Sequence, residues 1–333
     1  MSEYYQLDQD LFTDNQKSDT IRGGFGKGLK LAGQQDDRIV ALCADLTEST
    51  QINQFSEAFP ERFIEIGIAE QNLVTVASGM AMAGKIPFAS SYAAFNPGRN
   101  WEQIKTTIAI NDQPVKIIGA HAGVTVGPDG ATHQMLEDIA LMRAMPNMTV
   151  IVPGDAIEAE KVALAAAKSN KPCYIRLARP KLPIFSTNES PYEIGKAYVI
   201  REGYDVSLIG TGAETYQLLL AAKILAEKGI NAEVVHVPTI KPIDEETILQ
   251  SARRTGRLVT AEEAQIMGGL GGAIAELTST KLPTPLMRLG IDDRYGESGE
   301  PEELLDYFGL TGQKMAEKIM NFVYNTPQYH RQY

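Results

Sequence analysis

The sequence is poor in the residues that build disulfide scaffolds and metal sites. It has 333 residues but only two cysteines and four histidines. The cysteines, Cys43 and Cys173, each lie within an apolar strand-like run, which indicates buried free thiols in a reducing cytosol. No group of Cys and His residues has the spacing of metal ligands, so we expect no metal site in this chain.

Long apolar runs and basic segments are also missing. No apolar run approaches the roughly 18 residues that a membrane span requires. The first ten residues are acidic and polar, unlike a signal or transit peptide. No basic run offsets the net charge of −11, which argues against nucleic acid or a membrane surface as a partner. The composition therefore predicts a cytoplasmic globular protein.

The common nucleotide-binding motifs are absent as well. No GxxxxGK[ST] stretch occurs, which counts against an NTPase. The stretch GGLGGA at 268–273 follows a strand and opens a helix. Its spacing fails the dinucleotide fingerprint, because Ile274 stands at the third glycine position. Tight packing of a helix against a sheet is the better explanation.

Strand-like and helix-like segments alternate along the chain. Residues 38–43 form an apolar run, for example, and residues 21–29 have helical periodicity with Gly33 as a C-cap. Three prolines with Ser, Thr and Asn at 179–191 indicate a linker, after which the alternation restarts. The pattern predicts an α/β protein of two domains, each a mostly parallel sheet with helices on both faces. The predicted boundaries are 1–182 for the first domain, 183–194 for the linker and 195–333 for the second domain.

One stretch of the first domain places a carboxylate at the end of a strand. Residues 63–72 read FIEIGIAEQN, a strand and a glycine turn followed by a helix with Glu70 in its first turn. The helix after Glu70 is small and apolar on every face, which predicts that it is enclosed by the protein. Open α/β sheets bind ligands at the carboxyl ends of their strands. The simplest alternative is that Glu70 only complements the helix dipole.

A second polar cluster follows the strand at 115–121. His121 precedes a glycine-rich loop that contains Asp129, and His133 comes shortly after it. Two of the four histidines therefore stand with an aspartate at the edge that presents Glu70. Such a group can bind a polyhydroxylated substrate and move protons near neutral pH. A lone histidine is more often structural, but two of them on one glycine-rich loop beside a carboxylate favour a functional site.

Further candidates stand at the same edge. Asp45 and Ser49 follow the first strand, where helix capping would also explain them. Tyr92 and Phe95 end the third strand and can stack on a flat ring, although core packing is common for aromatic residues. Arg179 follows the last strand of the domain and can bind a phosphate or carboxylate, unless it is only a solvated linker charge.

Two of these motifs resemble those of the thiamine diphosphate enzymes of the transketolase family. They are GIAEQ at 67–71 and GPDGATHQ at 127–134, and GIDDRYGESG at 290–299 looks like the C-terminal domain of that family. The resemblance runs from about Asp19 to the end of the chain and covers only the C-terminal half of a full transketolase. The GDG stretch of the domain that binds the diphosphate through magnesium is absent.

The resemblance therefore implies the C-terminal subunit of a split transketolase. Thiamine diphosphate would lie between this chain and an N-terminal partner subunit that binds the Mg²⁺. By the same resemblance, two copies of each subunit would form an α2β2 assembly. The reaction would transfer a two-carbon ketol unit from a ketose phosphate to an aldose phosphate.

The family also implies a role for each candidate residue. Glu70 would hydrogen-bond the pyrimidine ring of the cofactor and favour the tautomer that takes the proton from the thiazolium carbon. Phe95 and Tyr92 match aromatic positions beside the pyrimidine, and Asp45 matches an aspartate near the cofactor at the subunit interface.

The remaining candidates match substrate positions of the family. The resemblance counts His121 and His133 with Glu70 as catalytic, and these histidines, with Asp129, would hold substrate hydroxyls. Ser49 and Arg179 match positions near the sugar phosphate.

Three alternatives stand beside this interpretation. A deoxyxylulose-phosphate synthase shares both motifs but usually has arginine where this chain has His121. The β subunit of a 2-oxo acid dehydrogenase lacks the DG-x-TH loop, and a non-catalytic scaffold subunit would need none of the site residues. Two positions depart from the family: Gln71 stands where many members have histidine, and Arg22 is out of register with a phosphate-binding arginine near Asp19. The origin of phosphate recognition therefore stays open.

Overall fold

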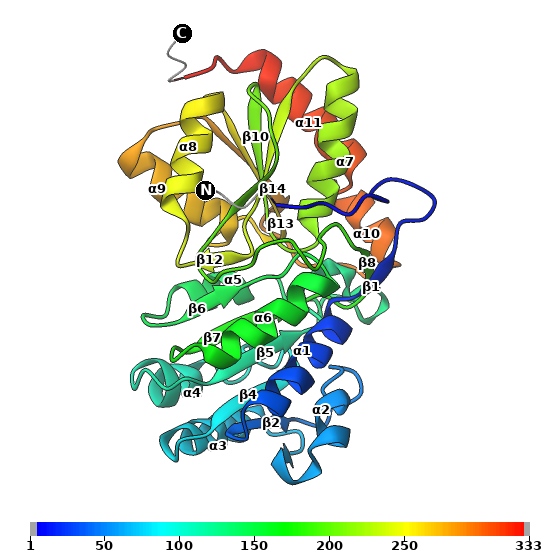
Figure 1. Ribbon diagram of the computed structural model, residues 1–333. Helices are drawn as coiled ribbons and strands as arrows, with labels where there is room; N and C mark the ends of the chain where they lie inside the picture. Colours follow the sequence, from blue (N-terminus) through cyan, green and yellow to red (C-terminus); the bar gives the residue numbers. More distant parts are fainter. Residues whose placement is uncertain (1–4, 330–333) are drawn as a thin grey trace.

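The protein contains two large sheets, one above the other in Figure 1, with helices packed against each. The structure, a computed structural model, describes residues 5–329. Residues 1–4 and 330–333, which the two predicted domains include, lie outside that range. A small antiparallel pair of strands, β1 (Ser18–Thr20) and β8 (Lys181–Pro183), lies beside the larger sheets.

The lower sheet has seven strands in the order β12-β6-β7-β5-β4-β2-β3, and every neighbouring pair except β12 with β6 is parallel. Its strands are β2 (Ile39–Cys43), β3 (Phe63–Glu65), β4 (Ile86–Tyr92), β5 (Lys116–Ala120), β6 (Thr149–Ile151), β7 (Cys173–Leu177) and β12 (Thr239–Lys241). Its helices and helical turns are α1 (Ile21–Gln35), α2 (Asn53–Ala58), η1 (Pro60–Arg62), α3 (Glu70–Met82), α4 (Trp101–Gln103), η2 (Ile104–Ala109), η3 (Val124–Asp129), α5 (Asp138–Arg143) and α6 (Ala156–Lys168).

The upper sheet has five strands in the order β14-β13-β10-β11-β9, of which only β9 runs antiparallel to its neighbour. Its strands are β9 (Tyr198–Arg201), β10 (Val206–Gly210), β11 (Ala232–His236), β13 (Leu258–Gln265) and β14 (Leu286–Ile291). Its helices are α7 (Glu214–Glu227), α8 (Glu245–Thr255), α9 (Leu270–Lys281), α10 (Pro301–Phe308) and α11 (Gly312–Asn325). The predicted α/β class with mostly parallel sheets is confirmed.

Strand β2 illustrates why helices must cover both faces of the lower sheet. All five of its residues are buried, and successive side chains point to opposite faces. Val40 and Leu42 pack in the cluster that contains α3, whereas Ile39, Ala41 and Cys43 pack in the cluster that contains α1 and α6. A strand that is covered on both faces therefore needs apolar residues at every position, and β2 has them.

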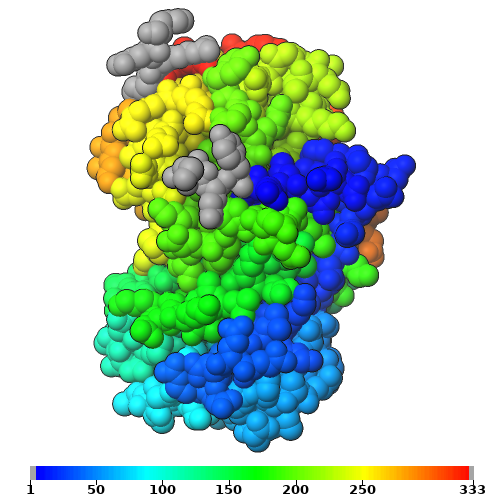
Figure 2. All heavy atoms as spheres, in the orientation of Figure 1, coloured from blue at the N-terminus to red at the C-terminus, as the bar shows by residue number. Residues whose placement is uncertain are grey.

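The two sheets are not independent of each other. Strand β12 comes from the second half of the chain, yet it pairs with β6 at the edge of the lower sheet. In the other direction, Tyr5, Leu7, Leu11 and Phe12 pack against the core of the upper sheet. This N-terminal segment runs along the boundary between the two halves in Figure 2. Both crossings join the two halves of the molecule.

Two details of the sequence analysis are wrong. Helix α1 does not end at Gly33 but continues to Gln35, and Gly33 packs against aromatic rings, where an added Cβ would lie 2.6 Å from a ring carbon of Phe55. Helix α3 is not enclosed on every face, because Met82 is 74% exposed. Only the face of α3 that carries Leu73, Val74, Ala77 and Ala81 packs in the core.

Both cysteines are buried free thiols, as predicted. Between residues 5 and 329, no helix has the combination of length and apolar composition that crossing a bilayer requires.

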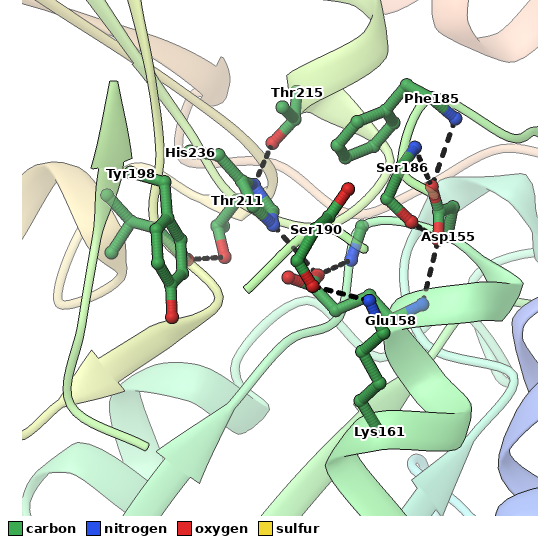
Figure 3. A network of polar contacts seen from close by, with 12 residues as sticks. Asp155, Glu158, Lys161, Phe185, Ser186, Ser190, Tyr198, Thr211, Thr215 and His236 are labelled. Carbon is green, nitrogen blue, oxygen red and sulfur yellow. Dashed lines mark hydrogen bonds and ion pairs between the residues drawn. The ribbon is translucent and has the colours of Figure 1, made fainter. Parts of the chain in front are cut away.

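A buried polar network joins α6 of the lower sheet to the upper sheet (Figure 3). His236 on β11 bonds Oε2 of Glu158 through Nε2 at 2.8 Å and Oγ1 of Thr215 through Nδ1 at 2.7 Å. Both ring nitrogens of His236 therefore have partners within this network.

Asp155 anchors the linker to the same helix. It is the N-cap of α6, where Oδ1 accepts the N–H of Glu158 at 2.9 Å. Oδ2 accepts the N–H groups of Phe185 and Ser186 at 3.0 and 2.7 Å, and Oδ1 also accepts the Ser186 hydroxyl at 2.8 Å. One fully buried carboxylate therefore satisfies donors from the helix and from the segment that enters the second half.

We expect Asp155→Ala to lower the free energy of unfolding by at least about 3 kcal/mol, because it removes a cap and leaves several buried donors without an acceptor. Thr20→Ala, which removes the single capping bond of α1 from Gly23, should cost only about 1 kcal/mol. Urea denaturation of the two variants measures both losses. An Asp155→Ala loss no larger than that of Thr20→Ala would contradict the anchoring role.

Candidate active site

The candidate site lies where several parallel strands of the lower sheet end. Strands β2, β3, β4 and β5 are mutually parallel neighbours, so their carboxyl ends share one edge. The loops that follow them carry most of the residues singled out from the sequence. This is the edge at which open α/β sheets bind ligands.

Glu70 is held in place through its own backbone. It is the first residue of α3, and 5% of it is exposed. The Asn100 side chain donates to the backbone oxygen of Glu70 at 2.8 Å and to Oδ1 of Asn96 at 3.0 Å. Asn96 in turn bonds backbone oxygens on β4 and next to it on β5, at Ala89 and Ile118. The backbone of Glu70 is therefore connected to the sheet through two asparagine side chains.

Among residues 5–329, one side chain, Arg99, forms an ion pair with the Glu70 carboxylate. Nη1 of Arg99 lies 3.3 Å from Oε2 and 3.4 Å from Oε1 of Glu70, and the guanidinium carbon lies 4.0 Å from the centroid of the Phe95 ring. The Arg99 side chain is about half exposed, so this long ion pair contributes little to stability. Sequence reasoning missed Arg99, although its place in the loop after β4 puts it at the same edge.

Four rings at the same edge of the sheet form one aromatic cluster, made of Tyr92, Phe95, His121 and His133. Tyr92 stacks on His121 with centroids 3.9 Å apart and on Phe95 with centroids 6.0 Å apart. His133 meets Phe95 edge-on at 5.5 Å and Tyr92 edge-on at 6.4 Å. The structure thus brings together four of the residues proposed from the sequence.

His121 is the buried member of this cluster. It is 4% exposed, its φ of 54° is in the left-handed region, and its Nδ1 has no hydrogen-bond partner among the described residues. Burial, together with the charges of Arg22, Arg179 and His133, lowers the pKa of His121 to about 3. The ring is therefore neutral at physiological pH, with one nitrogen left for a ligand.

Two arginines lie beside His121. Arg22, in the first turn of α1, donates to the backbone oxygens of Ser49 and Arg179, the latter at 2.7 Å. Arg179 donates to the backbone oxygen of Val126 in the glycine-rich loop. Burial lowers the pKa of Arg22, and its nearness to Arg179 contributes in the same direction. The sequence analysis set Arg22 aside on register, yet the structure places it with Ser49 and Arg179.

The glycine-rich loop, residues 123–130, depends on backbone angles that other residues rarely adopt. Gly123, Gly127 and Gly130 have φ of 89°, 84° and 71°. Asp129 is exposed near the end of this loop, and His133 follows it with Nδ1 3.0 Å from the hydroxyl of Thr132.

Asp45 lies on an adjacent loop. Its φ is 57°, its side chain is exposed, and its backbone N–H donates to Oε1 of Glu65 at 2.8 Å. Glu65 also accepts the N–H of Gly67 in the turn before α3. Within residues 5–329 no hydrogen bond or ion pair joins the side chain of Asp45 or Asp129 to the aromatic cluster.

Comparison with known proteins identifies the two halves of the chain. Residues 17–184 match the family described as "Transketolase, pyrimidine binding domain" and residues 195–315 match "Transketolase, C-terminal domain". A "putative transketolase C-terminal section" of Methanocaldococcus jannaschii is 46% identical over 303 residues, which cover 90% of this chain and 95% of that protein.

Two further proteins are similar over most of their length. The "6-deoxy-6-sulfo-D-fructose transketolase subunit SqwH" of a Clostridium species is 43% identical, with 85% of this chain and 88% of that protein covered. A solved structure described as "split gene transketolase, inactive beta4 tetramer" superimposes with a TM-score of 0.86 at 44% identity, covering 92% of this chain and 98% of that chain. The chain therefore belongs to the transketolase family, with the pyrimidine-binding domain of that family followed by its C-terminal domain.

Proposed function

We propose that this chain is the C-terminal subunit of a split transketolase, active when an N-terminal subunit completes its site. The observation that carries the proposal is the buried Glu70 carboxylate at the same sheet edge as four aromatic rings, one of which has a buried nitrogen without a partner among the described residues. The similar proteins named as a C-terminal section and as a subunit support a two-chain enzyme.

The residues at this edge fit the pyrimidine half of thiamine diphosphate. Glu70 offers a carboxylate for a ring nitrogen, and Phe95 and Tyr92 offer flat faces for a heterocycle. Asp45 would face the cofactor from the neighbouring loop. When bound, thiamine diphosphate supplies the carbon nucleophile that carries the two-carbon unit. We assign the diphosphate and its Mg²⁺ to the partner subunit, in an assembly of two copies of each chain in the cytoplasm.

The histidines are suited to hydroxyl groups of a sugar. A neutral imidazole such as that of His121 both donates and accepts hydrogen bonds, which matches the chemistry of a hydroxyl. His133 lies across the same aromatic cluster, and Asp129 at the adjacent loop adds an acceptor. These three residues would orient the ketose and acceptor chains and hold a proton during transfer.

The two arginines give the site a cationic end that can bind an anion. Arg22 and Arg179 lie together with Ser49, and a guanidinium binds phosphate or sulfonate oxygens with fixed geometry. We therefore propose sugar substrates with a terminal anion, and a ketose phosphate as donor. The similarity to a protein named for a sulfosugar supports a site that accepts either a phosphate or a sulfonate as the terminal anion.

We expect the complex of this chain with its N-terminal subunit to transfer ketol units between sugar phosphates. Glu70→Gln should lower its turnover about 100-fold or more, because the carboxylate contacts the reacting cofactor. A coupled assay with a ketose phosphate donor measures the rate, and circular dichroism checks that the variant is folded. Near wild-type turnover would remove Glu70 from the mechanism, and pyruvate-dependent deoxyxylulose phosphate formation alone would indicate a synthase.

We expect the isolated chain to bind thiamine diphosphate weakly, with or without Mg²⁺, because only the pyrimidine contacts come from it. Adding the N-terminal subunit should tighten binding by about 100-fold or more, as the diphosphate then gains its own contacts. Titration calorimetry on the single chain and on the complex compares the two. Tight, magnesium-dependent binding to the single chain would argue against a shared site.

The buried neutral His121 predicts a loss of stability in acid. Its pKa of about 3 in the folded chain lies below the ordinary 6.5 of the unfolded chain, so the unfolded state binds an extra proton between these values. Stability that is present above pH 6.5 is therefore lost as the pH falls toward 3. Between pH 7.5 and 5, His121 should account for about 2 kcal/mol.

Urea denaturation at the two pH values measures this contribution. His121→Asn should lose about 2 kcal/mol less than the wild type over the same interval. His133→Asn retains His121 and serves as the control, which should follow the wild type. Equal losses in the wild type and in His121→Asn would exclude the predicted linkage.

A further inference from the structure

The glycine-rich loop is held by a carboxylate from the other half of the chain. Glu263 lies on β13 of the upper sheet and is 3% exposed. Its Oε1 accepts the backbone N–H of Thr125 in the loop at 2.6 Å. The two residues are 138 positions apart in sequence, so this contact exists only once both sheets have formed.

The fit between Glu263 and the loop leaves no space for a side chain. A Cβ placed on Gly123 would lie 2.3 Å from Oε1 of Glu263, well inside van der Waals contact. Gly123 also needs its φ of 89°, which favours glycine. The start of the loop is therefore shaped around the carboxylate.

The charge of Glu263 lies next to a buried arginine. Nη2 of Arg176, on β7, donates to the backbone oxygen of Glu263 at 2.8 Å, and Nε bonds Oδ2 of Asp138 at 2.8 Å. Burial raises the pKa of the Glu263 carboxyl, and Arg176 is the main influence in the opposite direction. Glu263 thus has two separable features, an oxygen that reaches Thr125 and a charge near Arg176.

A second contact from the upper half closes over the end of the loop. Nε2 of Gln134 bonds the backbone oxygens of Gly127 at 3.2 Å and Glu297 at 2.7 Å. A Cβ on Gly130 would lie 2.5 Å from the hydroxyl oxygen of Ser298. Residues 296–299 therefore contact the loop near its end, while Asp129 stays exposed.

No hydrogen bond or ion pair among the described residues joins Glu263 to His121, Asp129 or His133. The hydrogen bond to Thr125 connects the Glu263 carboxylate to the loop that leads to these residues. Asp129 is in the loop, and the backbone N–H of His133 bonds the oxygen of Gly130 at 3.0 Å.

We propose that Glu263 is a positioning residue for substrate binding, in that it fixes the glycine-rich loop and with it Asp129 and His133. The C-terminal domain thereby contributes to sugar binding without touching the sugar. The role of Asp129 and His133 in this proposal rests on the proposed function, whereas the fixing of the loop does not.

Two conservative variants separate reach from charge. Glu263→Gln keeps the length of the side chain and an oxygen for Thr125 but loses the negative charge. Glu263→Asp keeps the charge beside Arg176 but is one methylene shorter and withdraws the oxygen from the Thr125 N–H. A positioning role depends on reach, whereas a purely structural charge balance depends on charge.

In the complex with the N-terminal subunit, Glu263→Asp should raise the KM for a ketose phosphate donor about tenfold, because the loop loses a buried hydrogen bond. Glu263→Gln should stay within about threefold of the wild type. Thiamine diphosphate affinity should be unchanged in both variants. In the full-length chain alone, hydrogen exchange of the peptide covering 123–134 should be about tenfold faster in Glu263→Asp only.

Glu262 provides the matched control. It is adjacent on β13 and fully buried, but its carboxylate accepts the N–H groups of Leu270 and Gly271 at the start of α9. Glu262→Asp should therefore leave both the KM and the exchange of the loop unchanged, even where it lowers stability.

Several results would overturn the proposal: a larger effect of Glu263→Gln than of Glu263→Asp, equal effects of the two, or an equal effect of Glu262→Asp. Should Glu263→Asp fail to fold, Glu263→Gln still decides, since a rise in KM beyond threefold contradicts the role of reach. Absence of ketol transfer by the wild-type complex would contradict the proposed function. The hydrogen-exchange measurements would still test whether Glu263 fixes the loop.

Discussion

The site depends on keeping a carboxylate at the apolar end of a parallel sheet. A buried charge there is unfavourable unless it is paired or hydrogen-bonded. The chain does not resolve this by surrounding Glu70 with donors. It fixes the backbone of Glu70 through Asn100 and Asn96 and leaves the carboxylate with one long contact to a half-exposed arginine. The structure therefore holds the acid firmly while leaving most of its hydrogen-bonding capacity for another group.

The other residues of the candidate site come from several different strands, helices and loops. The aromatic cluster comes from the ends of β4 and β5, where stacking of Tyr92 on His121 buries an imidazole. The arginines come from the first turn of α1 and the exit of β7. The loop between them is held from the upper sheet. The lower sheet therefore supplies the candidate site residues, and the upper sheet supplies a contact that holds the loop between them.

Much of this was predictable where the signal is local. Fully apolar runs such as 39–43 indicate strands enclosed on both faces, and Glu70, His121 and His133 were found because they follow such runs at one edge. Contacts that depend on distance in space were not predictable. Arg22 is 27 residues from Ser49 and 157 from Arg179 in sequence, so no spacing rule connects them.

The errors have physical causes as well. Gly33 has the residue type of a C-cap but serves close packing of an aromatic ring, which periodicity cannot distinguish. The exposed positions of α3 include the apolar Met82, and composition alone does not tell which apolar residues of a helix the core covers.

Strand β12 has a consequence for how the molecule can be divided. Because a segment from beyond the linker completes the edge of the lower sheet, a chain cut at the linker would expose the buried strand β6. A bare edge of this kind offers unpaired N–H and C=O groups to any other strand and promotes aggregation. The two halves have separate large sheets, but they depend on each other to fold. We therefore expect neither half to fold stably when it is expressed alone or joined to another protein.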